Sequence, residues 1–347
     1  MINWPWQNQK RLLGFWDFKS SNIALGSFIE FEVGLVCAAY EYGLKKIDLA
    51  LIYDASQPAG HPKFHTWISA GNIHYHLSEI FPLIYLMPQL GSFFIFNSHR
   101  EFEDFYLKNK EKYQMYPSYS DYTAGVGSLV KNMEFIKKLY EKNHSLPFLA
   151  PTKTSQEWAK SFIKEHCNGK YAVAVTIRLN SHQSLARNSN PQPWKTFFEY
   201  CRENHPDVVF LVIGRRNDRV QQEFRNFSNL IFPKDFNTNI EQDVALVENC
   251  CFFMATMSGL ASYVVFSTHI PYIISKYLPP FKHDLPQGYN LPWQNKELQH
   301  LLWGEEDSSL LIEKFNFLFS KINKTQWLDK IKNSNKDFLN WPYKKND

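Results

Sequence analysis

The sequence predicts an α/β protein of two domains, each built on a parallel sheet covered by helices. After residue 150, short apolar runs such as YAVAVTIR (171–178) and VVFLVI (208–213) alternate with helix-length amphipathic segments. These runs are apolar throughout, which predicts a sheet that is covered on both faces and closed by helical crossovers. The 347 residues, 44% of them hydrophobic, supply enough apolar side chains for two such cores.

In the second half, five strands are expected to alternate with five helices. The expected strands cover residues 171–178, 208–213, 229–232, 251–255 and 270–275. The expected helices cover residues 155–166, 192–204, 217–227, 240–249 and 259–267. With right-handed crossovers, this order predicts a Rossmann-like domain. The sequence has no G-x-G-x-x-G fingerprint, so a dinucleotide cofactor is not supported.

The first half shows the same alternation with longer loops. Strands are expected near residues 12–17, 47–53 and 92–96, with a helix near 27–43. The polar, proline-containing segment 145–158 is typical of a linker that ends at a helix start. We therefore expect two Rossmann-like domains that face each other across a cleft. Their boundaries are expected at residues 1–150 and 151–320, followed by a basic helical segment at 321–347 that is able to cross back to the first domain.

The positive charge of the chain is concentrated at its carboxyl end. The formal net charge is +4, and residues 320–347 alone carry seven lysines against three aspartates. A neutral body argues against a nucleic-acid partner, which would require a basic face on the fold. With Trp327, Phe338, Trp341 and Tyr343, this tail fits peripheral contact with an anionic membrane surface; a solvated terminal helix is the alternative.

Cysteine usage and the amino terminus bear on the cellular compartment. The five cysteines are odd in number, scattered and without a CxxC pair, which argues against a disulfide framework and a zinc site. The amino terminus has no apolar core of the signal-peptide type, and prolines interrupt the most apolar stretch. A cytoplasmic protein is expected, with the tail as a contact to the inner membrane surface.

Polar residues follow three strands of the second half, where open parallel sheets bind ligands. After the first strand come Arg178 and a loop with Arg187, Asn188 and Ser189. The second strand leads to Arg215, and the fourth leads to Ser258 and Gly259 at an expected helix start.

Arginine offers a planar fork of donors to phosphate oxygens, and backbone N–H groups at a helix start add neutral donors. A surface ion pair is the ordinary role for a single arginine, and a strand-to-helix turn is the ordinary role for Ser258–Gly259. Their joint placement at one sheet edge favours a diphosphate site.

In these features the chain resembles the GT-B glycosyltransferases, in particular the heptosyltransferase-like and fucosyltransferase-like enzymes of bacterial surface-polysaccharide assembly. The resemblance implies a nucleotide-sugar donor held by the second domain and a glycan or lipid-linked glycan acceptor held by the first. It implies no metal and no cofactor. Arg178, Arg187, Ser258 and Gly259 would surround the donor diphosphate, with Arg215 near it. The chain has ATMSGLASY (255–263) where heptosyltransferase-like groups carry an Asp-Thr pair and a His.

An inverting transferase also needs a general base on the acceptor side. Four carboxylates of the first half compete for this role: Asp17, Glu30, Glu32 and Asp54. His61 and His65 lie in the loop after Asp54. Each carboxylate has an ordinary alternative, since Glu30 and Glu32 could complement a helix N-terminus and Asp54 could cap a turn. The histidines at 61, 65, 74 and 76 lack a helical pairing with a carboxylate, which argues against a metal site.

Two other functions fit the same scaffold. One is a sugar-nucleotide epimerase or hydrolase, which would need several carboxylates and a histidine clustered across the cleft. The other is a glycan- or nucleotide-binding protein without a catalytic base.

Overall fold

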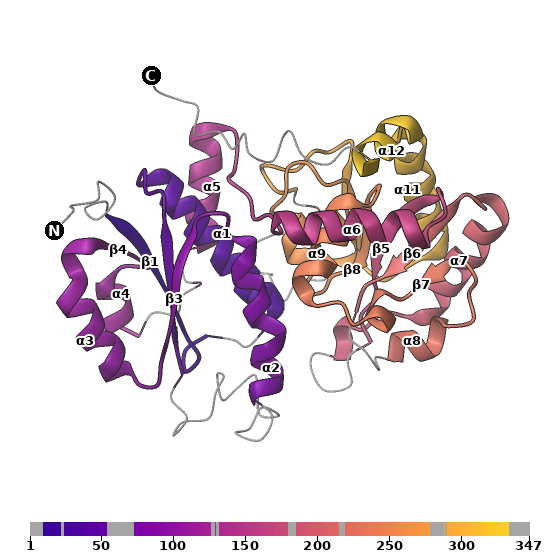
Figure 1. Cartoon of the computed structure of the whole chain (residues 1–347). Helices are drawn as coiled ribbons and strands as arrows, with labels where there is room; N and C mark the ends of the chain where they lie inside the picture. Colours follow the sequence, from indigo (N-terminus) through magenta and orange to yellow (C-terminus); the bar gives the residue numbers. More distant parts are fainter. Residues whose placement is uncertain are drawn as a thin grey trace.

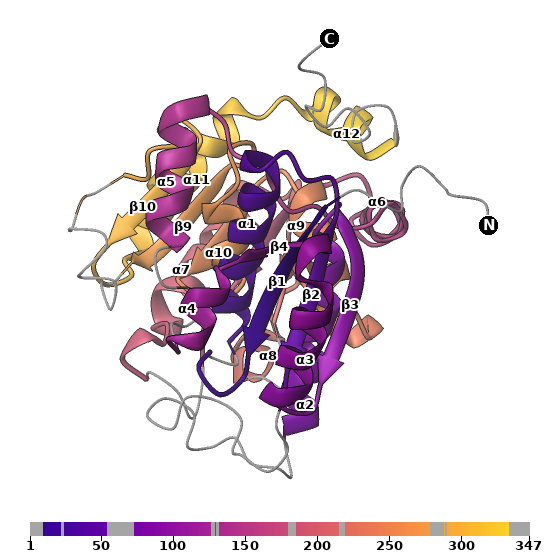
Figure 2. The same cartoon turned by 90° about the vertical axis from the view of Figure 1, so that its left-hand side faces the viewer.

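The computed structural model describes residues 10–21, 24–53, 73–125, 129, 132–179, 185–214, 219–277, 288 and 290–332. Within these residues the chain forms two parallel sheets, one in each half (Figure 1). Viewed from the side of the first half, its sheet lies in front of the second half (Figure 2). The predicted α/β class is confirmed.

In the first half, the described strands pair in the order β3-β2-β1-β4, all in parallel. The strands are β1 (Arg11–Asp17), β2 (Ile47–Ile52), β3 (Leu90–Phe96) and β4 (Tyr113–Tyr116). The helices are α1 (Leu25–Glu41), α2 (Ile73–Ile80), α3 (His99–Asn109), α4 (Tyr119–Thr123) and α5 (Asn132–Asn143), with 3-10 turns η2 (Phe81–Leu86) and η3 (Lys110–Lys112).

Strand β1 is buried on both faces because its alternate side chains enter two different cores. Leu12 and Trp16 belong to the core on the side of α1, and Leu13 and Phe15 belong to the core formed with α3 and α4. This double burial explains why the strand has no polar alternation before Asp17.

In the second half, the described strands pair in the order β10-β9-β8-β5-β6-β7, again in parallel. The strands are β5 (Tyr171–Thr176), β6 (Val208–Val212), β7 (Leu230–Ile231), β8 (Phe253–Thr256), β9 (Tyr272–Tyr277) and β10 (Gln299–Trp303). The helices are α6 (Lys153–His166), α7 (Pro191–Asn204), α8 (Arg219–Phe224), α9 (Ile240–Asn249), α10 (Ala261–Val265), α11 (Ser308–Lys321) and α12 (Lys324–Lys332), with 3-10 turns η4 (Leu185–Arg187) and η5 (Pro233–Phe236). This is the strand order of a doubly wound Rossmann sheet.

Helix α1 joins the two halves. It lies on the side of the first sheet that faces the second half (Figure 1), and residues 31–39 are buried without a break. A helix buried on all sides reads as apolar all round, which is why no polar face is visible in LGSFIEFEVGLVCAAYE. One hydrophobic core continues through α1 from the first sheet to the second.

All strands predicted from the sequence are present with shifted ends, and two further strands appear. Neither β4 (YQMY) nor β10 (QHLLW) carries a strand signal in its sequence, because both are short, partly polar and only partly buried. The helix expected at 259–267 is shorter, because α10 begins only at Ala261 and ends at Val265.

Of the C-terminal segment, which is expected to be able to cross back to the first domain, the structure describes residues 321–332. Helix α12 packs against α6 of the second half. Its Trp327 is buried, stacks on Tyr171 and donates its indole N–H to the Asn249 carbonyl at 3.0 Å. Phe338, Trp341 and Tyr343 lie outside the described residues, so membrane contact through them stays a prediction.

Among the helices that the structure describes, none has both the length and the hydrophobicity needed to cross a bilayer.

Candidate functional site

The strand order of each sheet reverses direction at one place, and ligands of open α/β sheets bind beside that place. In the second sheet it lies between β5 and β8, whose carboxyl ends are Thr176 and Thr256. In the first sheet it lies between β1 and β4, where β1 ends at Asp17. Both positions belong to segments that the sequence marked as candidates.

The loop after β5 folds back onto the end of β8. The backbone N–H of Ser189 donates to the Arg178 carbonyl at 2.7 Å, and the Arg178 N–H donates to Ser189 Oγ at 3.2 Å. Ser189 Oγ is also hydrogen-bonded to Thr256 Oγ1. The loop therefore has a fixed position at the edge of the sheet.

Arg187 brings a positive charge to this position. Its Nη2 donates to the Met257 carbonyl at 3.3 Å, and no carboxylate in the described part of the chain forms an ion pair with it. The guanidinium is half-buried, and burial lowers its pKa. A partly desolvated cation without a counter-charge is costly, so this arrangement favours binding of an anion.

Ser258 follows Met257 directly. Its hydroxyl is buried and makes no hydrogen bond in the structure. A buried hydroxyl without a partner costs about 1–3 kcal/mol, which a ligand acceptor atom would offset. Arg187 thus hydrogen-bonds the residue that precedes Ser258, whose buried hydroxyl has no partner.

Gly259 serves the contact between the halves. A Cβ atom on Gly259 would lie 3.0 Å from Leu25 Cβ and 3.2 Å from the Gly26 nitrogen, at the start of α1. Because α10 begins two residues later and has only five residues, the expected phosphate-binding helix start at Ser258–Gly259 is not formed. Glycine is needed here for the close approach of α1.

The remaining predicted residues of this edge have different surroundings. The Asn188 carbonyl accepts a hydrogen bond from Lys276 Nζ at 2.7 Å, so that segment is fixed through its backbone. Arg178 lies at the base of the loop and is half-buried. Arg215 lies outside the described residues.

Lys276 was missed by sequence reasoning. It is buried in β9 with a left-handed φ of 51°, and its Nζ pairs with Glu305 Oε2 at 3.0 Å. A backbone conformation that is rare for a side-chain-bearing residue is typical of functional edges. The only signal in the sequence was a lysine next to the predicted strand end.

A buried glutamate, Glu306, was also missed. It accepts hydrogen bonds from Trp194 Nε1 at 2.8 Å and from Thr256 Oγ1 at 2.7 Å. Since Glu306 comes from a loop more than 100 residues after Trp194, no local pattern could have paired them.

In the first half, Asp17 forms a pair with His99 at the start of α3. Asp17 Oδ2 lies 3.0 Å from His99 Nε2, and Oδ1 accepts the Lys19 N–H at 2.9 Å. The His99 ring stacks on Tyr122, whose hydroxyl donates to Glu103. Burial, followed by the Glu103 and Asp17 charges, raises the pKa of Tyr122. The sequence pointed to Asp17 but not to His99, which lies 82 residues away.

The other base candidates lie elsewhere. Helix α1 begins at Leu25, so Glu30 and Glu32 lie in its second turn and not at its start. Glu32 is fully buried, neither carboxylate oxygen has a hydrogen-bond partner, and burial raises its pKa well above the usual range. The Glu30 carbonyl accepts from Asn132 Nδ2 at 2.6 Å. Asp54, His61 and His65 lie outside the described residues.

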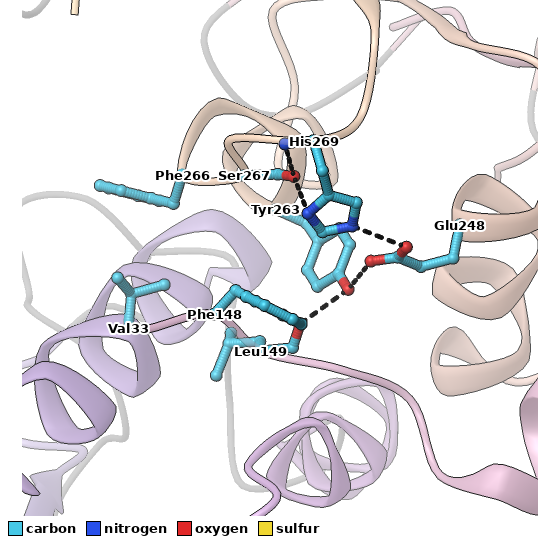
Figure 3. Close-up of a pocket in the computed structure, with 8 residues that line it drawn as sticks. All are labelled: Val33, Phe148, Leu149, Glu248, Tyr263, Phe266, Ser267 and His269. Atoms are coloured by element: carbon cyan, nitrogen blue, oxygen red, sulfur yellow. Dashed lines mark hydrogen bonds and ion pairs between the residues drawn. The ribbon is translucent and has the colours of Figure 1, made fainter. Parts of the chain in front are cut away.

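A small pocket lies where the linker meets the second half (Figure 3). The Tyr263 hydroxyl contacts the Leu149 carbonyl at 2.9 Å and Glu248 Oε1 at 2.5 Å, and Glu248 Oε2 lies 3.1 Å from His269 Nε2. Burial and the Glu248 charge raise the Tyr263 pKa. The cavity volume is about 10 Å³, room for roughly one water molecule, so the pocket is too small for a nucleotide. Its hydrogen bonds attach the linker to the second half.

Among the described residues, no group of three His, Cys, Asp or Glu side chains is arranged to hold a metal ion.

Comparisons with known proteins identify the fold. No protein-family model matches the chain, and no curated protein matches its sequence. The chain is similar in structure to the ADP-heptose LPS heptosyltransferase II of E. coli, with a TM-score of 0.56, 12% identity, and coverage of 90% of this chain and 99% of that one. It is also similar to a family 9 glycosyltransferase of Veillonella parvula, with a TM-score of 0.51, 10% identity, and coverage of 94% and 97%. The predicted resemblance to GT-B glycosyltransferases of the heptosyltransferase-like group is thereby confirmed at the level of the fold.

Proposed function

We infer that the protein is a glycosyltransferase that moves a sugar from a nucleoside-diphosphate donor to a hydroxyl group of a glycan acceptor. One observation carries this inference. Within the part of the chain that the structure describes, the half-buried Arg187 has no carboxylate partner, and it donates to Met257, the neighbour of the buried, unpartnered Ser258, at the switch point of the second sheet. The fold of the similar structures supports the reaction class.

On the donor side, the residues stabilise the leaving group. As the bond from the anomeric carbon to the phosphate oxygen breaks, negative charge builds on the diphosphate. Arg187 supplies a fixed positive charge and Ser258 a hydroxyl donor, both held by a partly water-excluded sheet edge. Loss of one such preorganised donor costs roughly 3–4 kcal/mol of barrier. The positive charge comes from the protein, so the proposal requires no metal.

On the acceptor side, the Asp17–His99 pair takes the proton. The acceptor oxygen forms its bond to the anomeric carbon while its hydroxyl proton passes to the pair, and the nucleoside diphosphate leaves with the electrons of the broken bond. Asp17 lies at the switch point of the first sheet and is paired with His99, whereas Glu32 is fully buried and out of reach of a substrate. These two features favour Asp17 over Glu32 as the base.

Both proposed sites are linked through the chain to the contact between α1 and Gly259. Asp17 is eight residues before Leu25, and Leu25 and Gly26 contact Gly259, the neighbour of Ser258. The name of the similar E. coli enzyme makes ADP-heptose the first donor to test and a lipopolysaccharide-type glycan the first acceptor.

A thermal-shift screen against UDP, GDP, ADP, CMP and dTDP tests the donor site. We expect one nucleotide to raise the Tm of the wild-type protein, because a ligand that binds only the folded state stabilises it. Arg187→Ala should abolish this shift. Arg225→Ala is the matched control, since Arg225 is paired with Asp235 at 3.0 Å on the surface and should keep the shift.

A lack of response to all five nucleotides would overturn the proposal. If a nucleotide binds, product analysis with the matching sugar donor then separates transfer from epimerisation and from hydrolysis. Binding without turnover of any acceptor would indicate a nucleotide-binding protein.

A further inference from the structure

We propose that Glu306 is a positioning residue for the donor site. Its carboxylate fixes the loop 185–190 so that Arg187 is held ready for the diphosphate. The inference rests on the proposed function, and it adds a residue that touches neither substrate.

Glu306 joins four separate segments. The residue is 9% exposed, and its Oε1 accepts from Trp194 of α7, Thr256 of β8 and, at 3.0 Å, Ser275 of β9. Oε2 accepts the backbone N–H of Asn190 at 2.8 Å. A buried carboxylate is tolerated when its oxygens are met by donors, and such charge-assisted bonds are stronger than neutral ones.

The direction of the hydrogen bonds can be assigned by counting protons. Thr256 has one hydroxyl proton, which it donates to Glu306, so the contact between Thr256 and Ser189 must use the Ser189 proton. Ser189 Oγ in turn accepts the Arg178 N–H. The Ser189 hydroxyl therefore donates its hydrogen bond to Thr256 Oγ1 and not to a ligand. We infer that Ser189 holds the loop in place, where the sequence had predicted a phosphate donor.

This chain of bonds reaches Arg187 by two routes, through the backbone that follows it and through its contact with Met257. Asn190 is fixed through its N–H by Glu306, and Ser189 is fixed through Thr256 by the same carboxylate. The guanidinium of Arg187 then contacts Met257, the residue after Thr256. One carboxylate thus sets the distance between the loop 185–190, here called the arginine loop, and the end of β8. Ser258 follows directly after that strand end.

Glu306→Gln tests the idea because an amide cannot replace this carboxylate. Whichever way the amide lies, its NH2 group faces an N–H donor that cannot act as an acceptor, either that of Asn190 or that of Trp194 Nε1. We expect the Kd for the nucleotide that stabilises the wild type, measured by calorimetry, to rise at least about tenfold. The KM for the donor should rise with it, and kcat should change less.

Asp243→Asn is the matched control for the loss of a buried carboxylate. Asp243 is 1% exposed in α9 and bonds Thr238 and Lys234, which have no contact with the arginine loop. It should lower the Tm and leave the nucleotide Kd unchanged. If Glu306→Gln does not fold, Thr256→Val provides the same test, because it removes the link between Ser189 and Glu306.

A raised Kd in Glu306→Gln or Thr256→Val, with an unchanged Kd in Asp243→Asn, supports the inference. If the wild type binds a nucleotide and all three variants bind it equally well, Glu306 has no positioning role and the proposed function stands. If the wild type binds none of the five nucleotides, both proposals are overturned.

Discussion

Among the residues that the structure describes, the half-buried Arg187 and the fully buried Glu32 are two ionisable side chains without a partner of opposite charge. They differ in what burial does to them. Arginine stays protonated at any physiological pH, so Arg187 keeps a charge that a ligand can neutralise. For Glu32, burial raises the pKa and both oxygens lack a hydrogen-bond donor, which favours the neutral form. The first side chain is suited to binding an anion, and the second is not.

We expect Glu32 to make stability depend on pH. A carboxyl whose pKa is raised in the folded state contributes its full stability below its unfolded pKa of about 4.3 and loses it as pH rises toward the folded pKa. Over that window, wild-type stability should fall by up to about 1.4 kcal/mol per pH unit through this group. Urea unfolding at several pH values measures the slope.

Glu32→Gln is the control because it keeps the shape and removes the titration. The unfolding free energy of this variant should lack the decrease with pH that Glu32 causes in the wild type, so its slope against pH should be smaller. Equal slopes in the two proteins would show that Glu32 does not titrate between the two states.

At the scale of elements, the junction between α1 and the turn before α10 decides how the halves meet. Gly26 and Gly259 allow the two backbones to touch, since a Cβ on Gly26 would lie 2.7 Å from Ser262 Oγ and 3.3 Å from Gly259 Cα. The same turn carries Ser258 of the donor site. Strain at this contact should therefore affect both stability and nucleotide binding.

Gly259→Ala tests this junction. Its Cβ would meet Leu25 Cβ at 3.0 Å, and we expect a loss of about 1–3 kcal/mol as the overpacked contact pushes α1 away. Gly214→Ala is the control, because nothing lies within 4 Å of a Cβ there. Equal stability of the two variants in thermal unfolding would contradict the tight junction.

The strands and helices could be predicted from the sequence because hydrophobic runs are local signals. The partners of the site residues could not be predicted in this way. The apolar runs of β5, β6 and β8 predicted a parallel sheet, and the polar residues after them predicted its ligand edge. The roles of His99 and Glu306 could not be predicted, because each is paired in the folded protein with a residue 82 or more positions away in the sequence. The helix expected to start at Ser258–Gly259 begins only at Ala261, and Gly259 instead contacts α1. No local sequence pattern indicates that contact.

At the scale of the whole molecule, the two halves divide the proposed reaction. The proposed anion site at Arg187 lies on the second sheet, and the Asp17–His99 pair lies on the first sheet. Each lies at the switch point of its own sheet, and the continuous core through α1 holds the sheets together. Binding of the nucleotide and transfer of the proton should therefore be separable by mutation.

The most direct test is to measure nucleotide Kd and transfer rate for Arg187→Ala and Asp17→Asn side by side, with the nucleotide found in the screen and its sugar donor. Arg187→Ala should lose nucleotide binding. Asp17→Asn should bind the nucleotide like the wild type while kcat falls by about 10²–10⁴-fold, the usual contribution of a general base. Wild-type nucleotide affinity in Arg187→Ala, or wild-type kcat in Asp17→Asn, would contradict the division of the reaction between the two halves.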